Sequence, residues 1–210
     1  MKRFTQICLL ITALCFALAA QAQQASKDKP RIAVLEFKNK ADNQWWYHGG
    51  AEAAQDVFVT ELMKAMQDVF VTELMKAKRF SVMDRKELET TAATQQLTLS
   101  GDIDPSTAIA LGKSLGVNYI LAGALTEYGV TDKRSGKGRA FVAAINARLI
   151  DTSTGEIVWA DEARSEEASF SSDSAEVKDV RTFKKTVKPC VDRLISKWRA
   201  SRRLDWQRAK

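Results

Sequence analysis

The sequence holds little of what metal and redox centres require. Of its 210 residues only one is His, His48, and three are Cys. Cys8 and Cys15 lie in an N-terminal segment that we expect to be removed, so Cys190 would be the sole thiol of the mature chain. One thiol and one imidazole exclude intramolecular disulfides and Cys/His metal sites. We expect no metal ion and no other cofactor.

Motifs for catalysis are missing as well. Gly112-Lys113-Ser114 ends like a phosphate-binding loop, but Thr107 stands where that motif requires its first glycine. A Ser-His-Asp triad would depend on His48 alone, and the sequence has no G-x-S-x-G elbow. Acids such as Glu162 and Glu166 could form a carboxylate pair, but a solvated run of charges explains them better. We therefore expect that the protein is not an enzyme.

Long apolar runs and a strong charge are also absent. No segment beyond the N-terminus has the roughly 18 consecutive apolar residues of a membrane span, so we expect no integral membrane insertion by a helix. The 32 basic residues include Lys2 and Arg3 of the removable segment, which leaves 30 against 26 acids and a net charge of +4. So small an excess does not indicate a nucleic-acid partner.

The first 22 residues have the pattern of an export signal. A positive start precedes an apolar stretch at 7–18, and Ala20-Gln21-Ala22 forms an A-x-A cleavage site. Cys15 follows Leu14 rather than a small residue, which is a poor context for lipidation. We predict Sec export to the periplasm, cleavage after Ala22, and a soluble rather than lipid-anchored product. Residues 23–30 are predicted to be a disordered leader.

Periodicity in the remaining chain predicts one α+β domain at 31–200, followed by a basic tail at 201–210. The expected order is β-α-β-α-α-β-β-β-α, a mixed β-sheet packed with helices. Asp84 and Asp104 are expected to N-cap two of the helices, and Gly116 to end the second of these. The strands are predicted at 31–37, 80–83, 117–128, 139–151 and 156–163, with a loop from 164 onward. The first helix is predicted at 51–78.

A terminal amphipathic helix is predicted from a further pattern. Apolar residues recur there every three or four positions, with a start or kink expected near Pro189. These residues are Phe183, Val187, Val191, Leu194, Ile195 and Trp198.

The long first helix contains an internal duplication. Residues 55–65 (QDVFVTELMKA) recur unchanged as 67–77. An offset of twelve residues rotates the second copy by about 120° around a helix axis, so the two apolar stripes should not face the same sheet. We expect the second copy to supply the core, through Val69, Phe70, Leu74 and Met75. The first copy would then leave a partly exposed stripe, a candidate partner-binding surface formed by Val57, Phe58, Leu62 and Met63.

Two further features are candidates for binding, each with a structural alternative. Trp45, Trp46 and Tyr47 stand together in a polar loop, where they would either cap the edge of the core or stack on a glycan or a partner protein. The basic tail would either be a solvated terminus or contact anionic lipid headgroups or an acidic partner.

Five pieces of sequence, in this order, resemble the CsgG/HfaB family, whose type member is the curli production assembly/transport component. The resemblance covers roughly residues 31–200 and implies a periplasmic α+β domain that can associate into rings and has no catalytic residues. The pieces are Arg31–Phe37, Trp45-Trp46 with Gly49-Gly50, Lys78–Arg85, Leu111-Gly112 with Gly116–Gly123, and Asp151–Trp159.

This chain departs from the family's channel members in two respects. Those members are lipoproteins, and they carry two long membrane-inserting hairpins. The corresponding stretches here, 132–138 and 164–180, are short or rich in charge, so we expect no insertion and at most peripheral outer-membrane association.

The resemblance implies a component of envelope or surface-fibre assembly or secretion, with envelope proteins as partners and homo-oligomers or rings as assemblies. A regulator of peptidoglycan synthesis, resembling the lipoprotein activators of penicillin-binding proteins, is the alternative. An envelope hydrolase is the third hypothesis, although the sequence offers no set of catalytic residues for it.

Overall fold

The computed structural model describes residues 29–41, 52–95, 99, 103–132, 139–170 and 180–201. The predicted signal at 1–22, most of the leader, the loop around His48, the turn at 133–138 and nearly all of the basic tail lie outside these ranges. The elements are β1 (Arg31–Val34), β2 (Lys38–Asn39), α2 (Glu52–Ala77), β3 (Ser81–Val82), α3 (Arg85–Thr94), α4 (Pro105–Leu115), β4 (Tyr119–Asp132), β5 (Arg139–Asp151), β6 (Ile157–Phe170) and α5 (Val180–Ala200). The α+β class and the predicted order are confirmed, with β2 as an addition.

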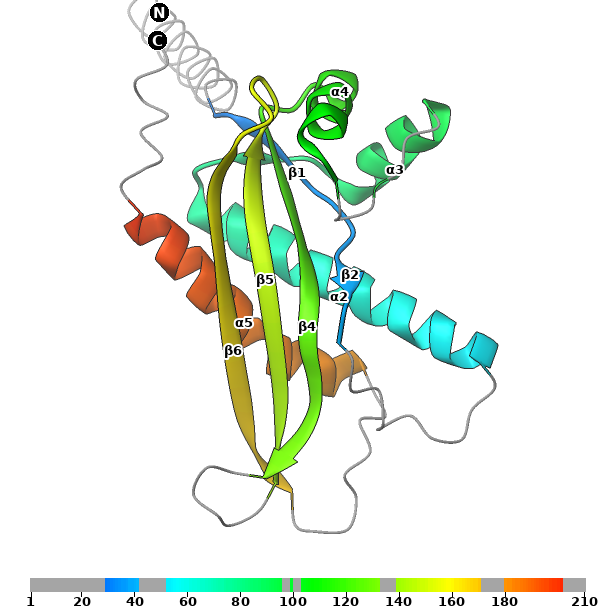
Figure 1. Ribbon diagram of the computed structural model, residues 1–210, viewed down its shortest axis with the longest axis vertical. Coiled ribbons are helices and arrows are strands. Elements are labelled where there is room, and N and C mark those ends of the chain that lie inside the picture. The colour runs from blue at the N-terminus through cyan, green and yellow to red at the C-terminus, as the bar shows by residue number, and fades with distance from the viewer. Residues whose placement is uncertain are drawn as a thin grey trace, which may run out of the picture.

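The strands form one mixed sheet in the order β3-β1-β4-β5-β6, and β2 pairs with β4 beside this path. β1 runs parallel to β3 and β4, whereas β4, β5 and β6 form an antiparallel meander. Figure 1 shows α2 and α5 crossing the long strands, with α3 and α4 at the end of the sheet where β4 begins. The hydrophobic core is therefore divided by the sheet into two parts.

The larger core lies between the sheet and the helices α2 and α5. Aromatic pairs hold it together: Phe37 stacks on Phe70 with ring centroids 4.7 Å apart, and Tyr128 meets Phe183 edge-on at 4.9 Å. A smaller core on the other face joins α3 and α4 to Ile120 and other residues at one end of the sheet. Successive residues of a strand point to opposite faces, so each long strand contributes to both sides of the sheet. Beyond α3 and α4, no helix among the described residues covers the second face.

Local signals placed several helix ends correctly. The Asp84 carboxylate accepts hydrogen bonds from the backbone N–H groups of Lys86 and Glu87, and Asp104 accepts one from Thr107. Gly116 ends α4 in the left-handed conformation, at φ 61°, where only glycine is unstrained. These three predictions are confirmed.

The predicted loop after residue 163 is wrong for its first part. β6 continues to Phe170, which pairs with Arg139. The extension was missed because its sequence, RSEEAS, lacks an apolar alternation. Ser165 is the buried residue on one side, and charged residues occupy the other. A strand with one solvated face does not need large apolar side chains on that face.

The terminal helix α5 buries the six apolar residues that the periodicity singled out. It begins at Val180, well before Pro189, which lies inside the helix. Pro189 is therefore not the start of α5. No helix in the described part of the chain is both long and apolar enough to cross a membrane.

The two copies of the duplicated segment form one continuous helix, α2. Phe70 and Leu74 of the second copy are buried and Val69 packs against the core, as predicted, but Met75 is 61% exposed. In the first copy, Leu62 and Met63 are only 1% and 4% exposed. The prediction that Leu62 and Met63 are partly exposed is therefore wrong, as is the prediction that Met75 belongs to the core.

The reason lies in the neighbours of α2. This helix contacts α5 as well as the strands β1, β2 and β3. Its side chains are therefore buried on more sides than a single sheet face would cover. Leu62 and Leu74 lie about 120° apart around the axis, yet both are buried. Gln67 is also buried, and its Nε2 donates to the Val34 carbonyl oxygen at 2.6 Å. Leu62 and Met63 of the first copy, like Gln67 at the start of the second, thus belong to the buried part of α2.

Candidate functional site on the open face of the sheet

The structure does not bring the sequence-predicted site residues together on a surface. Trp45, Trp46 and Tyr47 lie outside the described residues, and so do the side chains of Val57 and Phe58, whose backbone is part of α2. Leu62 and Met63, the other members of the candidate stripe, are core residues.

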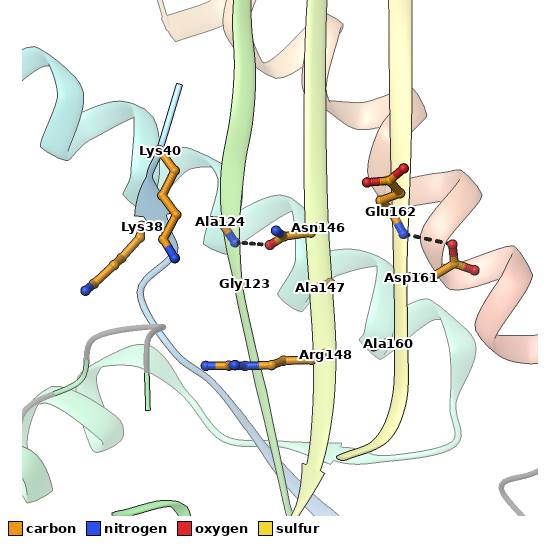
Figure 2. A pocket seen from close by; sticks show the side chains of 10 residues that line it. All are labelled: Lys38, Lys40, Gly123, Ala124, Asn146, Ala147, Arg148, Ala160, Asp161 and Glu162. Carbon is orange, nitrogen blue, oxygen red and sulfur yellow. Dashed lines mark hydrogen bonds between the residues drawn. The ribbon is translucent and has the colours of Figure 1, made fainter. Parts of the chain in front are cut away.

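A hollow of about 430 Å³ lies on the part of the sheet face that α3 and α4 leave uncovered (Figure 2). Residues from β2, β4, β5 and β6 contribute to it, together with Lys40 just after β2. Its lining consists of Lys38, Lys40, Gly123, Ala124, Asn146, Ala147, Arg148, Ala160, Asp161 and Glu162.

Alternation along the chain places the two lysines. Phe37 is buried against Phe70, Lys38 and Lys40 are exposed, and Asn39 between them is half-buried. The Lys40 backbone N–H donates to the Leu125 carbonyl oxygen at 2.8 Å, which continues the pairing of β2 with β4. Because side chains two residues apart in a strand share a face, both lysines stand on the rim of the hollow.

The packing of Phe37 against the sheet depends on the absence of a side chain at Gly123. A Cβ atom there would lie 2.5 Å from the Phe37 ring and 2.3 Å from the Asn146 carbonyl oxygen. Both distances are far below van der Waals contact. Glycine therefore allows β4 to lie close to both Phe37 and β5. With Ala124, Ala147 and Ala160, Gly123 also gives the hollow a lining of backbone and small side chains.

Two polar side chains of β5 are fixed in the hollow by backbone contacts. The Ala124 N–H donates to Oδ1 of Asn146 at 2.9 Å, so the Nδ2 group is the donor that this amide can offer to a ligand. Arg148 donates from Nη2 to the Ile103 carbonyl oxygen at 3.1 Å, which ties the guanidinium to the segment leading into α4. In Figure 2 the side chains of Lys38, Lys40 and Arg148 gather on the β2 side of the hollow, with Glu162 on the β6 side.

The two acids of the lining differ in their contacts. Asp161 pairs with Lys197 of α5 at 2.6 Å and also accepts a hydrogen bond from the Glu162 N–H. The hydrogen bond from Lys197 lowers the pKa of Asp161. Asp161 is therefore held by α5, and Glu162 is the carboxylate on the rim of the hollow.

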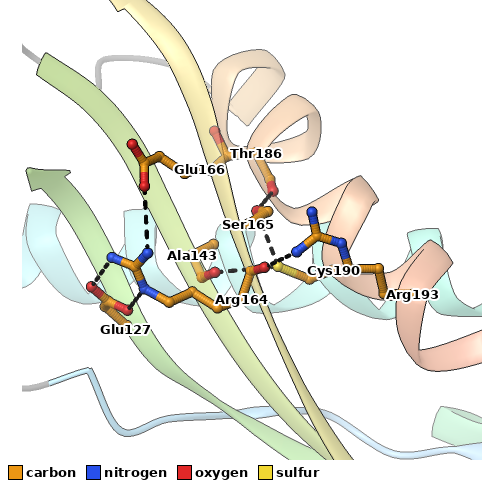
Figure 3. A network of polar contacts seen from close by, with 8 residues as sticks. All are labelled: Glu127, Ala143, Arg164, Ser165, Glu166, Thr186, Cys190 and Arg193. Atoms are coloured by element: carbon orange, nitrogen blue, oxygen red, sulfur yellow. Dashed lines mark hydrogen bonds and ion pairs between the residues drawn. The ribbon is translucent and has the colours of Figure 1, made fainter. Parts of the chain in front are cut away.

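Charges farther along the same face neutralise one another. Arg164 forms a two-pronged contact with the Glu127 carboxylate, at 2.6 and 3.0 Å, and lies 3.6 Å from Glu166 (Figure 3). The hydrogen bond to Glu127 raises the pKa of Arg164. Two carboxylates thus surround one guanidinium at this part of the face.

A buried polar cluster lies behind this face, between the sheet and α5. The Cys190 Sγ lies 3.2 Å from the Ala143 carbonyl oxygen and 3.1 Å from the Ser165 Oγ, which itself donates to the Thr186 carbonyl oxygen (Figure 3). Burial raises the pKa of the Cys190 thiol. A neutral, enclosed thiol is a poor nucleophile. The contacts of this cluster join β5 and β6 to α5. Among the described residues, no group of three or more His, Cys, Asp and Glu side chains could hold a metal ion.

Sequence reasoning missed the hollow, although parts of its signal were visible. The alternation at Phe37-Lys38-Asn39-Lys40 and the polar residues Asn146 and Arg148 on one side of a strand both indicate a solvated sheet face. The pairing of β2 with β4, which puts these side chains beside one another, has no local signature.

Comparison with known families now identifies the fold. The family model described as "Curli production assembly/transport component CsgG" matches residues 14–184. The chain belongs to the CsgG family. The match extends from the predicted signal segment through the whole sheet to the first turn of α5. It therefore includes every residue that lines the hollow.

Solved structures with the same architecture are distant in sequence. The hypothetical protein CT253 from Chlamydia trachomatis is 11% identical with a TM-score of 0.50, over 81% of this chain and 95% of that one. The lipoprotein GNA1162 from Neisseria meningitidis is 19% identical with a TM-score of 0.49, over 82% and 99%. The PelC dodecamer from Paraburkholderia phytofirmans, in a leucine-to-methionine variant, is 14% identical with a TM-score of 0.46, over 80% and 87%. At these identities the likeness concerns the fold alone. No curated protein matches this CsgG-family chain.

Proposed function

We propose that this CsgG-family protein is a non-enzymatic, periplasmic component of cell-envelope or surface-fibre assembly or secretion. The observation that carries the proposal is the family match over residues 14–184, to a model named for a curli assembly and transport component. In this proposal the protein acts by binding other envelope proteins, and copies of the chain associate with one another.

The helices pack on one face of the sheet and leave part of the other face open, which supports a role in binding. One face is packed along its length by α2 and α5, whereas the other presents a hollow with polar and charged walls and a lining of small residues. A concave surface with a few fixed polar groups is typical of a site for a ligand or a partner. The buried Cys190 thiol and the ion pairs around Arg164 hold β6 against its neighbours.

Affinity capture tests this function directly. The mature chain, starting at Gln23, is immobilised and exposed to envelope extracts of its own source, and the retained proteins are identified by mass spectrometry. We expect secretion or fibre-assembly components to be retained. Retention of a penicillin-binding protein in their place would favour regulation of peptidoglycan synthesis, and a capture with no specific envelope protein would contradict both readings.

Two further measurements examine the remaining parts of the proposal. Purified protein is tested for hydrolysis of ester, glycan and peptide substrates, and turnover of any of them that survives repurification would contradict a non-enzymatic role. The intact mass of the exported protein should correspond to a chain that begins at Gln23. A mass that includes an acylated N-terminal Cys would contradict the predicted cleavage after Ala22.

A further inference from the structure

Basic residues from three distant segments meet at one end of the sheet, where β1 begins, the chain turns from α2 into β3, and α5 ends (Figure 1). Three of them are exposed and the first is half-buried, and together they are called the basic end: Lys29, Lys78, Arg79 and Arg199. We propose that the basic end binds a membrane surface that carries anionic phospholipid headgroups. Such a surface is a binding partner in addition to the envelope proteins of the proposed function.

Aromatic contacts bring Arg79 and Arg199 close together. The Phe80 ring stacks on the Trp198 ring with centroids 5.0 Å apart, and the Arg79 guanidinium lies 5.7 Å from the centroid of the Trp198 ring. Arg199 follows Trp198 directly, in the last turn of α5. The turn after α2 and the last turn of α5 therefore carry their positive charges side by side.

A backbone contact adds Lys29 to this end. The Ser81 N–H donates to the Pro30 carbonyl oxygen at 3.0 Å, so the residue before Pro30 lies beside the start of β3. Within the described part of the chain, no carboxylate forms an ion pair with any of the four cations of the basic end.

Acids at this end of the sheet have contacts of their own. Glu73 pairs with Lys76 at 2.8 Å. The Asp151 carboxylate accepts hydrogen bonds from the Ser153 N–H and hydroxyl, at 2.8 and 2.6 Å. Glu156 is in the connection between β5 and β6, which packs against α4 on the other face of the sheet. The basic end is thus left with an excess of positive charge.

The backbone at Lys78 favours a role for its side chain. Lys78 ends α2 with a φ of 55°, in the left-handed region that glycine adopts without strain and lysine does not. Its N–H donates to the Met75 carbonyl oxygen at 3.1 Å, a contact that glycine would make equally well. The stability of the turn therefore does not explain the lysine, whereas a contact of its charge outside the domain does.

An exposed apolar side chain stands beside these cations. Met75 lies in the last turn of α2 and is 61% exposed. It is four residues before Arg79 and three before Lys78, so it lies next to both in the chain. Exposed apolar side chains among cations are typical of surfaces that lie in the membrane interface, where the apolar group enters the acyl boundary and the cations meet headgroups.

The adjoining sequence favours a lipid surface over an acidic protein. Beyond Ser201 the chain adds basic residues and one acid, Asp205; the basic residues are Arg202, Arg203, Arg208 and Lys210. Lipid headgroups diffuse laterally, so they can gather under charges from separate segments, whereas an acidic protein would have to match each charge with a fixed carboxylate. Each Lys or Arg at an anionic leaflet strengthens binding about fivefold, so these contributions add up.

Vesicle flotation with the mature protein, starting at Gln23 and produced without any acyl group, provides the test. Binding is measured on vesicles of phosphatidylglycerol and phosphatidylcholine in equal amounts, and on vesicles of phosphatidylcholine alone. We expect at least tenfold tighter binding to the mixed vesicles. This binding should weaken as salt is raised, because exposed charges are screened.

Matched charge reversals locate the site. K78E/R199E should weaken binding to the mixed vesicles at least tenfold. K184E/K185E makes the same charge change at two exposed lysines near the start of α5 and should weaken it less than twofold. Thermal melts establish that each variant is folded. If K78E/R199E does not fold, K78Q/R199Q replaces it, with an expected loss of at least threefold.

Two single substitutions separate binding from stability. K78G should lose about fivefold in binding without a lower Tm, because glycine accepts the positive φ. M75A should weaken binding at low and high salt alike, because insertion of an apolar side chain is not screened. Unaltered vesicle binding in both variants would contradict the roles of Lys78 and Met75.

Several results would overturn the inference. Equal binding to the two kinds of vesicle would contradict an anionic lipid surface, and equal losses in the two reversed variants would show attraction by net charge alone. Binding to polyglutamate that exceeds vesicle binding and is lost in K78E/R199E would assign the basic end to an acidic polypeptide. If an envelope partner is captured but the mixed vesicles are not bound, the proposed function stands and this inference is wrong.

Discussion

The duplicated helix contains an internal control for the energetics of the core. Met63 and Met75 occupy the same position in two copies of the hexapeptide TELMKA, within one continuous helix. Met63 is 4% exposed and Met75 is 61% exposed. Because the local sequence is identical, helix propensity and nearest-neighbour effects largely cancel when the two Met→Ala substitutions are compared. The difference between them reports tertiary burial.

We expect the two substitutions to differ strongly in stability. Replacement of a buried Met by Ala costs about 2–5 kcal/mol, through lost burial and the cavity that remains. An exposed substitution in a helix usually stays within about 0.5 kcal/mol. M63A should therefore reduce the free energy of unfolding by about 3 kcal/mol and lower Tm by roughly 6–12 °C. M75A should be almost neutral.

Urea unfolding followed by far-UV circular dichroism measures both variants, and L62A and L74A serve as a second pair. Leu62 and Leu74 are both buried, so these two variants should be destabilised to a similar extent. Similar costs for M63A and M75A would refute the reasoning. A cost for M63A below about 1 kcal/mol would show that the first copy is not part of the core.

Three shorter predictions concern other parts of the fold. A Cβ atom on Gly112 would lie 2.2 Å from the Thr152 Cβ, so G112A should cost about 1–3 kcal/mol in urea unfolding, and a neutral variant would contradict this packing. The Lys197 hydrogen bond lowers the pKa of Asp161, so its stabilisation is present above the unfolded pKa of about 3.9 and is lost as pH falls through the lower folded value. D161N should therefore flatten the decline in Tm between pH 5 and pH 3, and a decline parallel to that of the unaltered protein would argue against the pair. Arg193 and Lys197 donate to carbonyl oxygens of the edge strand β6, so R193A/K197A should expose this edge and self-associate more than the unaltered protein in sedimentation velocity; unchanged association would contradict this protective role.

Local chemistry explains why much of the fold was predictable. The carboxylates of Asp84 and Asp104 mark helix starts because short acids satisfy free N–H groups there. Gly116 marks an end because it accepts a positive φ. The strand at 139–151 was predicted with its observed bounds, since its buried face alternates clearly. Each of these signals is contained within a few neighbouring residues.

The features that escaped prediction depend on distant parts of the chain. The burial of Met63 and the exposure of Met75 follow from where α5 and the strands meet α2, which the identical copies cannot encode locally. The charged residues at 164–166 are part of a strand because β5 pairs with them, and their solvated face gave no apolar pattern. The hollow joins Lys38 to Arg148 through β4, so it exists only once the order of the strands is known.

Site-specific photo-crosslinking in the native envelope tests the central claim, that the protein acts through a partner on the open face of the sheet. A photoreactive phenylalanine analogue is placed at Ala160, an exposed residue in the lining of the hollow, and in separate controls at Thr72 of α2 and Lys184 of α5, which are exposed on the other side of the sheet. We expect a discrete crosslink to an envelope protein from position 160 that is absent or much weaker from positions 72 and 184. Crosslinks only from the helical side would contradict the account.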